Sequence, residues 1–171
     1  RGTFTLTAEG QSDSNIRRIF TTGFRSEWKN TMESQLLAIS PKAKLLSVDY
    51  GKNPKDYQAA PIKITFRYEI PDYALKGEKE MFFRPLVMNN LYNQVRSYLR
   101  IDTSLKERKY GFKDGCSRLV ELDETIQLPA GYKLANADKN ETMQGTGADF
   151  EGSLAQQGNK VLLHNKLALK K

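Results

Sequence analysis

The side chains best suited to nucleophilic catalysis occur once each in this sequence, as Cys116 and His164. A cysteine nucleophile needs a histidine base and a third group that orients the base. Cys116 lies in a turn-like segment at the start of an expected strand, away from the helix N-terminus that commonly activates a catalytic thiol. His164 lies in the middle of another expected strand, between Leu163 and Asn165. We therefore expect that neither residue takes part in catalysis, and we expect no catalytic residue in this chain.

Metal and cofactor sites are not expected either. One histidine and one cysteine cannot make a three-ligand zinc site without carboxylates. The spacing closest to a calcium loop is Asn136, Asp138 and Asn140, but it begins with an amide and has no glutamate at its twelfth position. The segment Gly145–Gly147 lacks the lysine and helix that follow in a phosphate-binding loop, so it predicts a flexible turn.

Paired carboxylates and interleaved aromatic and basic residues have simpler interpretations. Asp123 and Glu124 are adjacent on an expected strand, where neighbouring side chains point to opposite faces, so both are expected to be solvent-facing charges. Aromatic and basic residues interleave in Phe66–Tyr68 and in Arg108–Lys113, as in stacking platforms for single-stranded nucleic acid. Ordinary strands with an aromatic core face have the same pattern. Without an RNA- or DNA-binding signature, nucleic acid is not an expected partner.

The formal net charge is +7, from 27 Lys and Arg against 20 Asp and Glu. Most of these basic residues are interspersed with acids. The last twelve residues are the exception, because they contain four lysines and no acid. This distribution favours a solvated basic surface, and it leaves a basic module that binds polyanions as the alternative.

The first hundred residues predict strands and one long helix. Polar and apolar residues alternate strictly in Thr3–Ala8 and in Ile62–Ile70, as in half-buried strands. Between them, apolar residues recur at three- and four-residue steps from Ile16 to Ile39, which predicts an amphipathic helix of about 24 residues closed by Pro41. Further strands are expected at Leu45–Tyr50 and 80–84.

The remainder of the chain predicts mostly strands. The stretch 85–101 fits a short helix and an irregular crossover equally well. The expected features that follow are a strand with one bulge at Arg118–Gln127, a turn at Leu128–Leu134, a polar loop at Asn136–Thr142, and a hairpin formed by Phe150–Ala155, Gly158–Asn159 and Lys160–Leu169.

These patterns define an expected fold class and organisation. We expect an α+β fold with mainly antiparallel, sandwich-like β-sheets and one long amphipathic helix near the N-terminus. Residues 1–100 form an α+β segment and residues 101–171 an all-β segment, packed together as one unit. No apolar run approaches the ~20 residues that cross a bilayer, so no membrane span is expected.

The start of the chain and its cysteine content indicate which cellular compartments are expected for the protein. The sequence begins at Arg1 without a leader, so we expect an export signal to have been removed or the chain to be a piece of a longer protein. A single cysteine excludes an internal disulfide and fits either the cytoplasm or an exported bacterial protein.

Several motifs together resemble the C-terminal region of bacterial transglutaminase-like proteins. The C-terminal motifs are Glu107-Arg108, the run Ile126-Gln-Leu-Pro-Ala-Gly-Tyr132, Gly152-Ser-Leu154 and Gly158-Asn-Lys-Val-Leu162. Upstream, Gly10, the helix beginning near Ile16-Arg17-Arg18 and the strand after Pro61 are similar to the region just after that family's core.

The resemblance implies a domain context. In that family an exported chain carries an N-terminal β-rich domain, a papain-like Cys-His-Asp core and a C-terminal domain of unknown function. The core would lie upstream of Arg1, so no catalytic residue is carried over. The resemblance implies a non-catalytic accessory or interaction domain in the bacterial periplasm or another extracytoplasmic space. Its partner would be the rest of its own polypeptide or an envelope protein.

Overall fold

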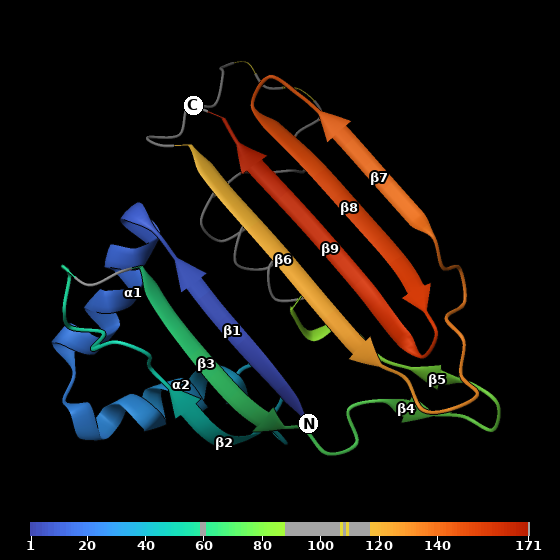
Figure 1. The fold of residues 1–171 in the computed structure, drawn as a ribbon, viewed down its shortest axis with the longest axis horizontal. Coiled ribbons are helices and arrows are strands. Elements are labelled where there is room, and N and C mark those ends of the chain that lie inside the picture. Colours follow the sequence, from blue (N-terminus) through green and yellow to red (C-terminus); the bar gives the residue numbers. More distant parts are fainter. Residues whose placement is uncertain (59–60, 88–106, 108, 110–116, 171) are drawn as a thin grey trace. The chain divides into compact units, whose positions relative to one another are not determined.

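The computed structural model describes residues 1–58, 61–87, 107, 109 and 117–170. The chain divides into two compact units, Arg1–Phe83 and Arg84–Lys171 (Figure 1). The boundary expected between residues 100 and 101 lies outside the described residues, as does most of the stretch 85–101. Each unit is described by itself.

The described residues of the N-terminal unit form two α-helices, one 3-10 helix and two antiparallel sheets. Its elements are β1 (Gly2–Ala8), α1 (Gly10–Thr22), the 3-10 helix η1 (Arg25–Glu27), α2 (Trp28–Leu37), β2 (Lys44–Asp49), β3 (Ile62–Glu69), β4 (Leu75–Lys76) and β5 (Met81–Phe82). The larger sheet has the strand order β1-β3-β2, and β4 pairs with β5 in a separate ribbon. The strands expected from residue alternation in β1 and β3, and the strand expected at Leu45–Tyr50, are confirmed.

The expected long helix is wrong, because the chain leaves the helical conformation at Gly23 and Phe24. Both have extended backbone, with φ/ψ of −110°/161° and −73°/147°. The hydroxyls of Thr21 and Thr22 donate back to the Arg18 carbonyl, and β-branched residues followed by glycine are poor helix formers. The three- and four-residue spacing of apolar residues continues through this break, although the helix itself does not. The expected fold class is therefore corrected: the described chain is mostly antiparallel β-sheet with two short α-helices.

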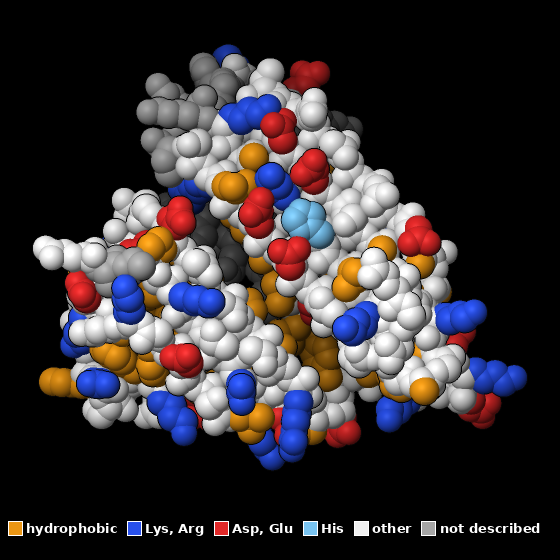
Figure 2. All heavy atoms as spheres, in the orientation of Figure 1, with side chains coloured by type: hydrophobic (Ala, Val, Ile, Leu, Met, Phe, Trp, Pro, Cys, Tyr) orange, Lys and Arg blue, Asp and Glu red, His pale blue; other side chains and the backbone are white. Residues whose placement is uncertain are grey.

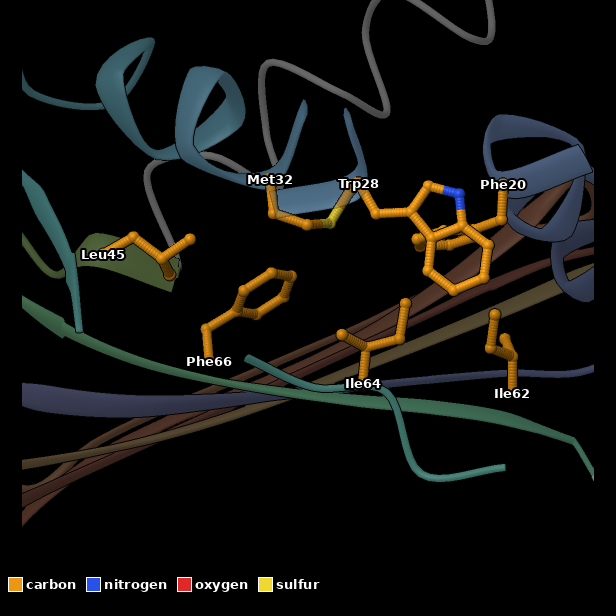
Figure 3. Packing of buried hydrophobic residues seen from close by; sticks show 7 residues of the cluster. All are labelled: Phe20, Trp28, Met32, Leu45, Ile62, Ile64 and Phe66. Carbon is orange, nitrogen blue, oxygen red and sulfur yellow. The ribbon is translucent and has the colours of Figure 1, made fainter. Parts of the chain in front are cut away.

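The core of the N-terminal unit lies between the helices and one face of the β1-β3-β2 sheet. Figure 3 shows aromatic and sulfur-containing side chains from the helices above aliphatic and aromatic side chains from the strands; the cluster is Phe20, Trp28, Met32, Leu45, Ile62, Ile64 and Phe66. Phe20 is at its centre with no exposed surface, and its ring meets those of Trp28 and Tyr50 edge-on at 5.1 and 5.7 Å. Edge-to-face contacts of this kind add to the free energy gained from burial.

A buried arginine ties α1 to the loop that precedes β3. Arg17 is only 2% exposed, and its Nε donates to Asp13 Oδ2 at 2.7 Å. Its Nη1 donates to the carbonyls of Pro54 and Asp56 at 3.3 and 2.8 Å. The other carboxylate oxygen of Asp13 accepts from the Ile62 backbone N–H at 2.7 Å. The pair therefore joins one helix, one loop and the first residue of β3.

This carboxylate makes the stability of the unit dependent on pH. The hydrogen bond from Arg17, with help from the Ile62 N–H, lowers the pKa of Asp13 below its ordinary value of 3.8 despite partial burial. Because the folded pKa is below the unfolded one, the stabilisation is fully present above the unfolded pKa and is lost as the pH falls through the folded pKa. We expect Asp13→Asn to be less stable than the parent at neutral pH. It should also lose less unfolding free energy than the parent between about pH 6 and about pH 3, measured by urea unfolding. Equal acid losses in the two proteins would contradict this role of Asp13.

The described part of the C-terminal unit is built on one four-stranded antiparallel sheet. Its strands are β6 (Arg118–Gln127), β7 (Lys139–Gln144), β8 (Ala148–Gln157) and β9 (Lys160–Leu169), in the order β6-β9-β8-β7. The predicted β8–β9 hairpin is confirmed, and Gly158 at φ +60° supplies the left-handed backbone of its two-residue turn. The bulge expected in β6 is wrong, since β6 pairs with β9 in unbroken register over its full length. The expected polar loop is wrong from Lys139 onward, because that polar segment pairs with β8 as an edge strand.

Candidate functional site: a polar row across the C-terminal sheet

One face of the C-terminal sheet carries polar side chains from all four strands. Directly opposed residues share a face in antiparallel strands, and the register aligns Asn140, Ser153, His164 and Asp123 in one row from β7 to β6. We call this set the polar row. It contains the histidine that the sequence singled out, beside a carboxylate that is 41 residues away in the chain.

His164 and Asp123 are hydrogen-bonded across β9 and β6. Nδ1 of His164 lies 2.8 Å from Oδ1 of Asp123, and because a carboxylate only accepts, Nδ1 carries the proton. Figure 2 shows the histidine in pale blue on the surface, with acidic side chains around it. Such a bond fixes both the tautomer and the orientation of an imidazole.

A carboxylate that orients a histidine next to a serine is also found in Ser-His-Asp triads. Here, however, the side chains of His164 and Asp123 are 39% and 81% exposed. Electrostatic stabilisation of an acyl-transfer transition state depends on groups held in a site from which water is excluded. The geometry therefore supports an oriented surface histidine rather than a nucleophilic centre.

Two of the four lysines of the basic C-terminal run pair with acids of neighbouring strands. Lys166 Nζ lies 3.4 Å from Glu121 Oε1 on β6. Lys170 Nζ lies 2.6 Å from Asp149 Oδ1 on β8, and this hydrogen bond lowers the pKa of Asp149 below its ordinary value of 3.8. These two pairs reduce the net charge that the C-terminal strand presents.

Glu124 has a different role from its neighbour Asp123. The prediction that they face opposite sides of the sheet is confirmed, but Glu124 is not a solvent-facing charge. Its two carboxylate oxygens accept from the backbone N–H groups of Leu86 and Val87 at 2.7 and 3.1 Å. Glu124 thereby fixes the first residues of the C-terminal unit to its sheet, a link that nothing in the sequence signals.

We expect Glu124→Ala to destabilise the C-terminal unit by about 1–3 kcal/mol, because two partly buried N–H groups lose their charged acceptor. The adjacent exposed variant Asp123→Ala is the matched control, and it should change the unfolding free energy by less than about 1 kcal/mol. Urea unfolding followed by far-UV circular dichroism measures both. Similar losses in the two variants would contradict the role assigned to Glu124.

A shallow hollow lies where the turn after β6 meets the β8–β9 hairpin. Its lining residues are Gly131, Tyr132, Lys133, Gln156, Gly158 and Asn159. The predicted turn is confirmed, with Gly131 at φ +85° and the Tyr132 N–H donating to the Pro129 carbonyl. The Gln156 side chain accepts from the Leu134 N–H at 2.6 Å and donates to the Gly158 carbonyl at 2.7 Å. The polar groups of Gln156 thus hold the turn and the hairpin in place.

Of the other residues considered for chemistry, those that the structure describes are not brought together. Cys116 lies outside the described residues. Asn136 and Asp138 have left-handed backbone, whereas Asn140 belongs to β7, so the three do not form a single loop. Among the described residues, no group of three or more His, Cys, Asp and Glu side chains has the geometry of a metal site. No described helix is long and apolar enough to span a membrane.

These features define the class: a β-rich protein with antiparallel sheets, in which charged side chains pair across strands. The family described as Domain of Unknown Function with solved-structure structure (DUF3858) matches residues 79–171, more than half of the chain. The chain belongs to this family. No curated protein matches it, and no solved structure matches it. The expected membership in a domain family of unknown function is confirmed, while the transglutaminase-like context stays a prediction.

Proposed function

We propose that this chain is a non-catalytic accessory or interaction domain of an exported bacterial transglutaminase-like protein. The observation that carries the proposal is the cross-strand pairing in the C-terminal sheet. His164, Lys166 and Lys170 of the β9 region each contact an acid of β6 or β8. Side chains that are paired on an open sheet stabilise and orient one another, as in a structural or docking surface.

The edge strand β7 indicates how such a domain would contact a partner. β7 is the last strand of the sheet, and all six of its residues are exposed. The outer backbone groups of an edge strand can pair with a strand of another polypeptide. In this proposal the partner is the catalytic core of the same polypeptide or an envelope protein.

The proposal predicts no turnover by the isolated chain. Transglutaminase and protease assays on the purified chain and on Cys116→Ala should give the same background. If the unmodified chain were active and Cys116→Ala were not, the non-catalytic assignment would be overturned. Cell fractionation of the full-length protein tests export: recovery in the periplasm supports it, and recovery only in the cytoplasm contradicts it.

A further inference from the structure

The N-terminal sheet has a second face that points away from its core. Because side chains alternate along strands, those of β1 and β3 that do not pack against the helices lie on this face. Most of them are exposed, and all except Glu69 at the end of β3 carry a hydroxyl or a positive charge. We call this set the outer face: Thr3, Thr5, Thr7, Lys63, Thr65, Arg67 and Glu69.

The strand register places a hydroxyl-bearing residue opposite each cation. Arg67 lies directly opposite Thr3 on β1 and Ser47 on β2, and Lys63 lies opposite Thr7. Between them, the hydroxyl oxygens of Thr5 and Thr65 are 3.2 Å apart. The outer face thus alternates positive charge with groups that both donate and accept hydrogen bonds.

Two acids lie beside these cations, Glu69 two residues from Arg67 on β3 and Asp49 directly opposite Thr65 on β2, and each has another partner. Glu69 accepts from Arg1 Nε at 2.7 Å, and Asp49 accepts from the Gly51 N–H at 2.9 Å. In the part of the chain that the structure describes, neither Lys63 nor Arg67 has a carboxylate within 4.0 Å. The two cations lie four residues apart on β3, which corresponds to about 13 Å along the strand. This arrangement fits an extended ligand with repeated negative charges.

We propose that the outer face binds a linear acidic polysaccharide. Its carboxylates pair with Lys63 and Arg67, and its sugar hydroxyls bond to the threonine rows. The aromatic residues of the strands disfavour single-stranded nucleic acid, because Phe66 is buried and stacks on Phe4 at 6.0 Å in the core. Bases would find no aromatic platform on this face. This inference goes beyond the proposed accessory role, and the two proposals do not depend on each other.

Isothermal titration with sodium alginate oligomers, a polyuronate, tests the proposal at about 50 mM salt, where charge screening is moderate. The double variant Lys63→Gln/Arg67→Gln should bind roughly tenfold more weakly, since each exposed ionic contact is modest. Arg18→Gln/Lys29→Gln is the matched control, because it removes the same charge from exposed positions of α1 and α2. The control should bind within about twofold of the parent. The single variant Lys63→Glu should also weaken binding, and it replaces the double variant as the test if the double variant fails to fold.

Several outcomes would overturn the proposal. One is no heat of binding with alginate at millimolar concentration. Equal losses in the two double variants would show a general charge effect. Binding of neutral dextran as tight as that of alginate would remove the role of the cations, and tighter binding of oligo(dT) than of alginate through Lys63 and Arg67 would assign the face to nucleic acid. None of these outcomes bears on the assays for catalysis.

Discussion

Replacing Phe20 with alanine should lower the free energy of unfolding of the N-terminal unit by about 3–5 kcal/mol, the cost of removing a large buried aromatic side chain. Phe20 is fully buried, and its ring contacts those of Trp28 and Tyr50. Truncation leaves a cavity between α1 and the sheet, where two rings lose an edge-to-face partner. The chain's single tryptophan, Trp28, lies in this cluster, so its fluorescence reports unfolding of this unit in urea.

Phe24→Ala is the matched control, because Phe24 is the same residue type four positions later and is 77% exposed. It should change the unfolding free energy by no more than about 0.5 kcal/mol, as surface substitutions usually do. A loss at Phe24 comparable to that at Phe20 would show that both rings share one buried helix face. That result would restore the unbroken helix expected from the sequence.

Phe20 and Phe24 also show why the helix expected from the sequence was too long. Phe20, Phe24 and Trp28 repeat every four residues, and periodicity alone cannot distinguish one helix from two helices joined by a kink. Local signals for a break were present in Thr21, Thr22 and Gly23, all weak helix formers. Their effect depends on whether the core can accept the continuing helix, which is a tertiary property.

Strands with strict alternation were predictable, because one face of each must be buried. β3 and the β8–β9 hairpin agree with their expected ranges, the latter aided by the turn at Gly158–Asn159. β7 was not predictable, since Lys139–Gln144 contains a single apolar residue, Met143, and its pairing with β8 comes from the sheet. The polar row depends on the same non-local register, so the contact between His164 and Asp123 could not be read from either segment alone.

An arginine of an amphipathic helix is expected on its exposed face, yet Arg17 is among the most buried side chains described. We expect Arg17→Met to lower the free energy of unfolding by about 3–5 kcal/mol, as removing one partner of a buried ion pair does. Methionine retains much of the volume, so the loss arises mainly from polar groups left without their donor. These are the carboxylate of Asp13 and the carbonyls of Pro54 and Asp56. The change also frees the loop that Arg17 fixes to α1.

Arg18→Met separates this effect from a general loss of positive charge, because Arg18 is the next residue of α1 and is exposed. It should leave the unfolding free energy within about 0.5 kcal/mol of the parent, again followed by Trp28 fluorescence in urea. Arg17→Lys should be intermediate, since an ammonium keeps the charge but cannot reach the carboxylate and both carbonyls in the fixed geometry of a guanidinium. A double change to Arg17→Met and Asp13→Leu should recover part of the loss, because it removes the buried charge that has no partner. If Arg17→Met were as mild as Arg18→Met, the arginine would be a tolerated buried group, and the loop before β3 would be held by other contacts.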